Sequence, residues 1–302
     1  MRPRARKRFG QHFLERAWVA KLVRAIAAGE TDKILEIGPG AGALTLPLAA
    51  AVHRIVAVEI DSDLTAALRS TAPPNVSVIE GDFLDLTADR LLEVLSDTPQ
   101  RSVRAVSDTP RRSVRGVSEG CLRQWRVVGN LPYNVASPIL FKLVELHRSG
   151  VGLVDATLML QREVADRLLA EPGSRVYGIP SVLIRHAADV ERVFDLPPGA
   201  FRPRPKVEST VVRLRFRDDR PAVRSREALA KLVHAVFTRR RKTLANALLA
   251  YRPDAKADIE AALTQAGIDG RRRPESLDIA DYVRLSDAFE PAGRDRPAGN
   301  EK

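Results

Sequence analysis

The sequence predicts an α/β protein, with a Rossmann-like sheet followed by a small C-terminal all-helical domain. Three observations predict this class. Short apolar runs alternate with stretches of helical periodicity through the first two thirds of the 302-residue chain, which is typical of a doubly wound parallel sheet. A glycine-rich turn follows the first of these runs. After residue 218 no convincing strand pattern remains, and apolar residues recur at helical spacing.

The first two thirds of the chain are expected to build the sheet element by element. The expected helices are 15–28, 43–51, 61–69 and 138–146. The expected strands are 33–37, 54–58, 75–79, 125–129 and 156–160. The alternating pattern of 209–217 predicts a late strand, which would pair with 190–194 as an antiparallel edge hairpin.

The chain is expected to divide into two domains and a tail. Residues 1–221 contain all the predicted strands and would form the sheet domain. Residues 222–288 carry apolar positions at helical spacing, such as Leu229, Leu232 and Val236, and would form the helical domain. Residues 289–302 are polar and rich in Gly and Pro, so we expect a disordered tail.

Residues 96–117 interrupt this plan with a tandem repeat. The units 96–106 and 107–117 differ only at Gln100/Arg111 and Ala105/Gly116. Two copies are too few for a solenoid, and long surface loops cost little free energy. We interpret the repeat as a flexible insertion, with an RNA-contacting arm as the alternative.

Composition excludes several classes of protein. No stretch approaches the ~18 consecutive apolar residues of a membrane span, so no membrane partner is expected. The basic N-terminus has no apolar segment after it, which argues against a secretory signal. The single cysteine, Cys121, excludes an internal disulfide framework and a multi-cysteine zinc site. We therefore expect a cytoplasmic protein that requires no metal.

The charge of the chain favours a polyanionic partner. Its 49 basic and 38 acidic side chains give a formal net charge of +11. Basic residues gather at 2–8, 239–242 and 271–273. Nucleic acid is the first expectation, and a generally arginine-rich composition is the alternative.

The glycine-rich turn and the next strand predict a nucleoside-cofactor site. Gly38, Gly40 and Gly42 lie between a strand and a helix, where glycine permits a sharp turn and close approach of a ligand. Glu59 ends the following strand and can accept both hydroxyls of a ribose. This pair alone does not separate a nicotinamide dinucleotide from S-adenosylmethionine.

Two further strand ends indicate adenine chemistry. Asp82 ends the third strand, where it would accept a hydrogen bond from an adenine amino group, or act as a turn or N-cap residue. Asn130-Leu131-Pro132-Tyr133 ends the fourth strand. The Asn130 side-chain oxygen and the Leu131 carbonyl can accept both hydrogens of an adenine amine, which otherwise is a poor nucleophile. Pro132 would stiffen the turn, and Tyr133 would offer a stacking face. A sulfonium methyl donor is already activated, so catalysis would consist mostly of positioning.

These motifs resemble those of the small-subunit (16S) ribosomal RNA adenine dimethyltransferases, relatives of the antibiotic-resistance rRNA adenine methylases. The resemblance covers about residues 6–290 apart from the repeat. The matching segments are 10–14, 36–45, 58–61, 81–82, 128–134, 159–165, 172–174, 197–207, 240–244 and 273–275.

The resemblance implies a Rossmann-like methyltransferase that places two methyl groups on each of two adjacent adenines near the 3′ end of small-subunit rRNA. S-adenosylmethionine would be the donor and the small ribosomal subunit the partner. Nothing in the sequence suggests an obligate oligomer, so we expect a monomer. The implied cofactor contacts are His12, Leu14, Gly38, Glu59, Asp82 and Asn130, to which the turn adds Gly40. Tyr133 and Phe201 would flank the target base, completing a catalytic set with Asn130, Leu131 and Pro132. The basic cluster Arg239, Arg240, Arg241 and Lys242 would contact RNA. One departure is His12, where the family usually has Asn.

Three other functions stay open from the sequence alone. A methylase of large-subunit rRNA would share the chemistry, although segments 240–244 and 273–275 favour the small subunit. A ribosome-assembly factor with secondary or lost methylation is a second alternative, against which the intact site residues argue. A dinucleotide oxidoreductase is the third, but Asn130-Leu131-Pro132-Tyr133 has no role in hydride transfer.

Overall fold

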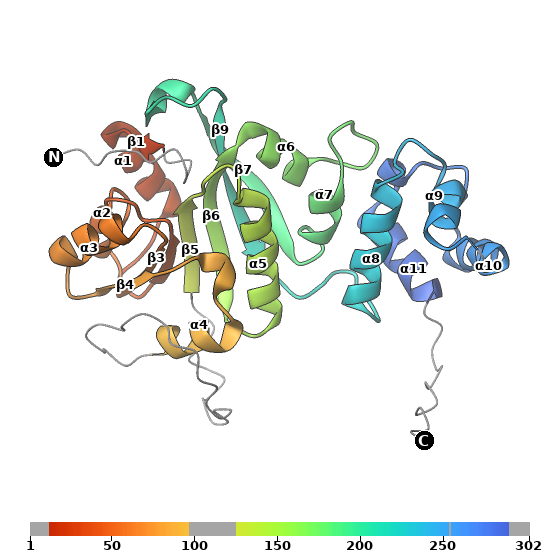
Figure 1. Ribbon diagram of the computed structural model, residues 1–302, viewed down its shortest axis with the longest axis horizontal. Helices are drawn as coiled ribbons and strands as arrows, with labels where there is room; N and C mark the ends of the chain where they lie inside the picture. Colours follow the sequence, from red (N-terminus) through yellow and green to blue (C-terminus); the bar gives the residue numbers. More distant parts are fainter. Residues whose placement is uncertain (1–11, 97–124, 254, 290–302) are drawn as a thin grey trace, which may run out of the picture. The chain divides into compact units, whose positions relative to one another are not determined.

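The structure is a computed structural model that describes residues 12–96, 125–253 and 255–289 (Figure 1). All of the predicted insertion except Ser96, and the tail from 290 onward, lie outside these residues. The chain divides into two compact units. We call 1–169 with 188–217 the sheet unit, and 170–187 with 218–302 the helical unit.

The sheet unit contains a seven-stranded sheet in the order β4-β3-β2-β5-β6-β9-β7. Its strands are β2 (Lys33–Ile37), β3 (Arg54–Glu59), β4 (Val76–Glu80), β5 (Trp125–Asn130), β6 (Leu153–Gln161), β7 (Ala188–Leu196) and β9 (Ser209–Phe216). The first five in that order are parallel, which confirms the predicted doubly wound sheet. β9 runs antiparallel to both β6 and β7, so the predicted pairing of 190–194 with 209–217 is also confirmed.

Helices alternate with the parallel strands, as the sequence pattern predicts. α2 (Thr45–Ala49), α3 (Ser62–Thr71), α4 (Ala88–Leu95) and α5 (Ala136–Arg148) connect them, while α1 (Arg16–Ile26) precedes β2 and α6 (Arg162–Leu169) follows β6. In Figure 1, α5 lies across the face of the sheet that is turned to the viewer. α2 is shorter than expected, because residues 40–44 form turns after the glycine-rich segment. A short antiparallel pair, β1 (Phe13–Leu14) with β8 (Phe201–Arg202), was not expected from the sequence.

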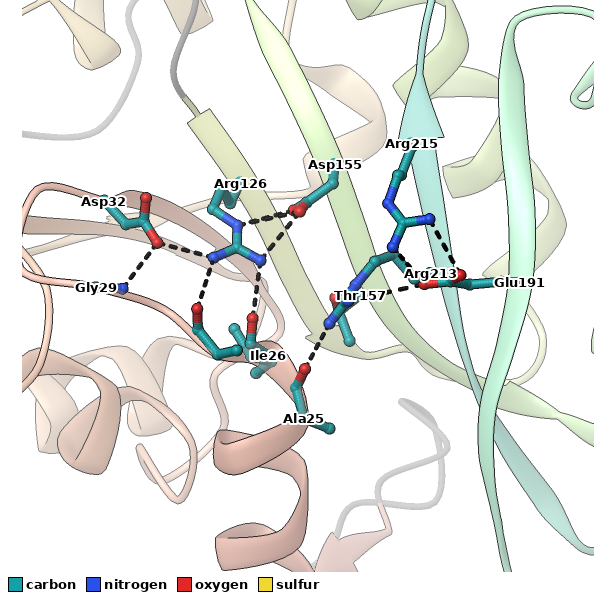
Figure 2. Close-up of polar contacts among 11 residues, drawn as sticks. Ala25, Ile26, Gly29, Asp32, Arg126, Asp155, Thr157, Glu191, Arg213 and Arg215 are labelled. Atoms are coloured by element: carbon teal, nitrogen blue, oxygen red, sulfur yellow. Dashed lines mark hydrogen bonds and ion pairs between the residues drawn. The ribbon is translucent and has the colours of Figure 1, made fainter.

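Arg126 anchors the end of α1 to the sheet (Figure 2). Its guanidinium donates hydrogen bonds to the carbonyl oxygens of Ile26, at 2.8 Å, and Ala27, at 3.3 Å. It also forms ion pairs with Asp32 at 2.8 Å and Asp155 at 3.0 Å. Burial lowers the pKa of Arg126, but the hydrogen bonds to the two carboxylates outweigh it and hold the pKa above its ordinary value. Carbonyls at a helix end lack partners within the helix, so this contact satisfies two of them and fixes the C-terminal end of α1 against the sheet.

The helical unit packs helices around one apolar core. Its longer helices are α8 (Arg226–Phe237), α9 (Leu244–Tyr251), α10 (Lys256–Ala266) and α11 (Ile279–Phe289). A shorter helix, α7 (Ile179–Leu183), also belongs to this unit, although we expected residues 170–187 in the sheet domain. The reason is packing, because Tyr177 and Val182 are buried in the same cluster as Leu232 and Leu248. Within the described residues, no helix is long and apolar enough to cross a membrane.

Candidate cofactor and substrate site

A cavity of about 370 Å³ opens at the carboxyl ends of the parallel strands. The strand order reverses between β2 and β5, and ligands of open α/β sheets bind at such a switch point. The predicted site residues that line the cavity are His12, Leu14, Gly38, Gly40, Glu59, Asp82, Asn130, Leu131, Pro132 and Tyr133. Segments far apart in sequence therefore meet where the motifs predicted a site.

The glycine-rich turn forms one wall of the cavity. Gly38, Gly40 and Gly42 have φ values of 67°, 59° and 80°. Residues other than glycine rarely adopt this backbone conformation. The Gly40 amide donates a hydrogen bond of 2.9 Å to Glu59 Oε2. The turn after β2 is thereby tied to the carboxylate at the end of β3.

Glu59 is a buried carboxylate with a fixed orientation. Its side chain is held by the bond from Gly40 and by a second from the Asp61 amide to Oε1, also at 2.9 Å. Burial raises its pKa, and these backbone hydrogen bonds partly oppose the shift. Each oxygen keeps a further lone pair, so the group can still accept hydroxyl hydrogens of a ligand.

Glu36 is a cavity residue that our reading of the motifs did not single out. It lies in β2, is 2% exposed and lines the cavity. Its Oε2 is buried and has no hydrogen-bond partner among the described residues. Burial raises the pKa of this carboxyl to about 7, and the nearby Glu59 charge adds to the shift. The signal in the sequence was an acidic residue between the apolar Leu35 and Ile37, two positions before Gly38.

Asp82 and Asn130 complete the polar rim. Asp82 accepts a 2.9 Å hydrogen bond from the Leu84 amide, so it is an N-cap of the short helix η2 (Phe83–Asp85) as well as a cavity residue. Asn130 ends β5, and its Nδ2 donates a 2.8 Å hydrogen bond to the His12 carbonyl oxygen. This bond orients the amide and leaves Oδ1 as an acceptor.

Tyr133 and His12 form a stacked aromatic pair at the cavity. Their ring centroids lie 5.4 Å apart with an interplanar angle of 26°. The Tyr133 hydroxyl shares a 2.7 Å hydrogen bond with Ser209 Oγ. Burial raises the pKa of the phenol, so it stays neutral at physiological pH. His12 Nδ1 lies 2.8 Å from the Pro203 carbonyl oxygen, an acceptor, so this nitrogen carries the hydrogen.

Five predicted residues do not line this cavity. Phe201 is 0% exposed and packs in the apolar core with Leu22, Ile26 and Val211. It supports the strand that carries Leu14, through the β1–β8 pairing. Its expected place against a base therefore stays a prediction. The remaining four, Arg239 to Lys242, lie in a turn of the helical unit, where Arg240 donates a 3.1 Å hydrogen bond to the Arg175 carbonyl oxygen.

Solved structures share this fold. A dimethyladenosine transferase from Plasmodium falciparum matches with a TM-score of 0.64 and 23% identity, covering 91% of this chain and 96% of that one. The 23S rRNA methyltransferase ErmE matches with a TM-score of 0.60 and 24% identity, covering 92% and 100%. At this identity the likeness shows the fold, which is that of the Rossmann-like methyltransferases.

Sequence comparison then gives the family. The family model described as ribosomal RNA adenine dimethylase matches residues 2–290, and the chain belongs to that family. A relative from Acinetobacter baylyi, called ribosomal RNA small subunit methyltransferase A, is 39% identical over 95% of this chain and 93% of its own length. One of the same name from Nitrosococcus oceani is 41% identical, over 94% and 95%.

Proposed function

We propose that this chain is an S-adenosylmethionine-dependent dimethyltransferase of small-subunit rRNA. It transfers methyl groups to the N6 amines of two adjacent adenines near the 3′ end, giving N6,N6-dimethyladenosine during ribosome biogenesis. The observation that carries the proposal is the end of β5, where the bond from Asn130 Nδ2 to His12 leaves Oδ1 without a hydrogen-bond partner among the described residues, in a cavity that Tyr133 also lines. Relatives named for the small subunit support that subunit as the target.

The cavity fits the methyl donor by its donor and acceptor groups. Glu59 would accept the ribose hydroxyls, and Asp82 the adenine amino group of the cofactor. Gly38 and Gly40 let the backbone approach the ligand. Leu14 and His12 close the cavity from the β1 side. S-adenosylmethionine supplies an activated methyl group on a sulfonium, and the transfer needs no metal.

The residues after β5 would activate the acceptor by position. An adenine amine is unreachable inside a base stack, so the target base must be extruded into the cavity. Asn130 Oδ1 and the Leu131 carbonyl accept its two hydrogens and direct the nitrogen lone pair toward the methyl group. Pro132 holds the turn, and Tyr133 stacks on the base. The amine loses a proton after transfer, so no strong base is required. In-line positioning supplies most of the rate enhancement.

The helical unit would bind the RNA backbone. Arg239, Arg241 and Lys242 are exposed, and an exposed cationic turn suits phosphate contacts. We infer that the enzyme acts as a monomer on the assembling small subunit in the cytoplasm. Size-exclusion chromatography with light scattering tests the monomer, which a dimer mass would contradict.

The alternatives make different predictions about the substrate. A large-subunit methylase is disfavoured because the likeness to ErmE shows the fold alone, whereas the small-subunit relatives match at about 40% identity. An assembly factor without methylation is disfavoured by the intact acceptor at Asn130 and the buried Glu59.

The deciding experiment incubates the purified protein with labelled S-adenosylmethionine and unmethylated small ribosomal subunits. Large subunits and free rRNA run in parallel, and modified nucleosides are identified by mass. We expect dimethyladenosine in small subunits only. Label in large-subunit RNA would support the resistance-methylase alternative. Cofactor binding without methylation of any substrate would support an assembly factor. The Asn130→Ala variant should lose methylation, while subunit binding persists.

A further inference from the structure

A short basic segment, residues 202–207, is bonded to a residue that lines the cavity, since Pro203 contacts His12. Arg204 and Lys206 are exposed, and neither has an ion-pair partner in the part of the chain that the structure describes. The neighbouring charges are satisfied locally. Arg202 pairs with Glu15 at 3.2 Å, and Glu208 forms an ion pair with Arg162. Within residues 12–96, 125–253 and 255–289, the segment therefore offers two cations without an ion-pair partner, and it contains no carboxylate of its own.

Pro205 is the one buried residue between 202 and 207, and Arg204 and Lys206 on either side of it are exposed. Both cations therefore lie at the surface of the protein. Pro203 and Pro205 restrict the backbone, which lowers the entropy lost when a ligand binds.

The segment is bonded to the wall of the cavity at its start. The Pro203 carbonyl oxygen accepts the 2.8 Å hydrogen bond from His12 Nδ1. The His12 ring stacks on Tyr133, the residue that would carry the target base. Arg202 is paired with Phe13 in the β1–β8 ladder. Arg204 directly follows Arg202 and Pro203, which these contacts hold in place. Its position is therefore fixed relative to Tyr133.

We propose that Arg204 and Lys206 bind the RNA backbone phosphates that flank the extruded adenine, and that His12 couples this phosphate site to Tyr133. The proposal rests on the proposed function and adds to it a substrate subsite. A base leaves its stack together with its own sugar and phosphates, so cations beside the base platform meet the flanking backbone. Such contacts fix register and orientation, and carry no sequence information directly. The His12 side chain would then serve the substrate, in addition to its expected place near the cofactor.

Salt dependence of binding tests the phosphate contacts. Binding to unmethylated small subunits is measured over a range of KCl at fixed Mg²⁺, without cofactor, for the wild type and for Arg204→Ala/Lys206→Ala. Log K falls as log salt rises, and each lost phosphate contact makes this negative slope less steep by about 0.7–0.9. We expect the double variant to reduce the steepness by roughly 1 to 2, with unchanged affinity for S-adenosylmethionine in calorimetry.

A matched control is Arg24→Ala. Arg24 is an exposed cation in the last turn of α1, at the opposite end of that helix from β1. Its removal changes the net charge without touching the segment, so the slope should stay at the wild-type value. A double variant with the wild-type slope would overturn the proposal, whether or not the protein methylates RNA. Failure of the wild type to bind S-adenosylmethionine would instead refute the proposed function.

The coupling through His12 is tested by His12→Phe. Phenylalanine keeps a stacking ring on Tyr133 and removes the donor to Pro203. We expect the KM for small subunits to rise several-fold in His12→Phe, with a smaller change in kcat. In the Arg204→Ala/Lys206→Ala background, His12→Phe should raise the KM much less, because the phosphate contacts that His12 positions are already absent. Equal effects in both backgrounds would refute the coupling.

Discussion

Glu36 makes the stability of the ligand-free protein depend on pH. Its carboxyl has a pKa of about 7 in the fold, against an ordinary value of 4.5. The folded protein therefore binds the proton more tightly than the unfolded chain does. The stabilisation is complete below pH 4.5 and is lost as the pH rises through 7. Glu36→Gln stays neutral, so we expect it to exceed the wild type by about 3 kcal/mol at pH 8 and by much less at pH 5.

Urea unfolding of both proteins at pH 5, 6, 7 and 8, without cofactor, measures this difference. Parallel pH profiles for Glu36→Gln and the wild type would show that Glu36 is already ionised in the folded state. The comparison between pH values matters more than either absolute stability, because the amide also replaces an oxygen that has no partner in the described structure.

Two substitutions at Tyr133 distinguish the contribution of its aromatic ring to catalysis from that of its hydroxyl. Tyr133→Phe keeps the stacking face and loses only the hydrogen bond to Ser209, which contributes about 1 kcal/mol. Tyr133→Ala loses the face, and base stacking on an aromatic side chain contributes about 1–3 kcal/mol. We expect kcat/KM for small subunits to fall less than about tenfold in Tyr133→Phe and by more in Tyr133→Ala. Equal losses in steady-state assays would assign the role to the hydroxyl.

At the scale of elements, the turn after β2 requires glycine for two different reasons. A Cβ on Gly42 would lie 2.6 Å from Leu68 Cδ1, at a φ of +80°. A Cβ on Gly38 would meet nothing within 4 Å, although its φ is +67°. Gly42→Ala therefore adds a steric clash to backbone strain, while Gly38→Ala adds strain alone. We expect Gly42→Ala to lose about 1–3 kcal/mol more stability than Gly38→Ala in urea unfolding. Similar losses of stability would mean that the Leu68 side chain of α3 moves aside and so removes the clash.

Elements with a strong local pattern were predictable, and those that depend on distant partners were not. The parallel strands β2 to β5 are mostly apolar runs with Gly38, Glu59, Gly81 or Asn130 at or just after their ends, so the edge of the sheet that carries the site followed from the sequence. The β1–β8 pair joins Phe13 to Arg202, and two-residue strands have no periodicity to detect. α4 lies just before the repeat and was not predicted, although Thr87 is a regular N-cap residue that the sequence shows.

The same distinction holds for the site. Gly38, Glu59, Asp82 and Asn130 follow consecutive strands of a parallel sheet, which brings them together at one edge whatever the rest of the chain does. The contact of His12 with Tyr133 and Pro203 joins three separate segments, and no local signal predicts it. Likewise, the sequence could not show that Phe201 is enclosed by the apolar core.

At the scale of the whole molecule, the sheet unit and the helical unit are interleaved along the chain. The boundaries fall at 169/170, 187/188 and 217/218, so the chain passes between the units three times. Residues 170–187 bury Tyr177 and Val182 in the core of the helical unit. A chain cut at residue 221, the boundary that the sequence suggested, would keep this segment and remove α8 to α11. The segment would then expose apolar surface that has no remaining partner.

We therefore expect a protein of residues 1–221 to be less soluble and less stable than one of residues 1–217 in which a short Gly/Ser linker replaces 170–187. Light scattering reports aggregation, and urea unfolding followed by circular dichroism reports stability. The replacement leaves β6, β7 and β9 intact, and their ladders continue the sheet to its edge. If 1–221 were the better-behaved protein, residues 170–187 would have to stabilise the sheet unit directly. The interleaving would then be a feature of chain order without energetic consequence.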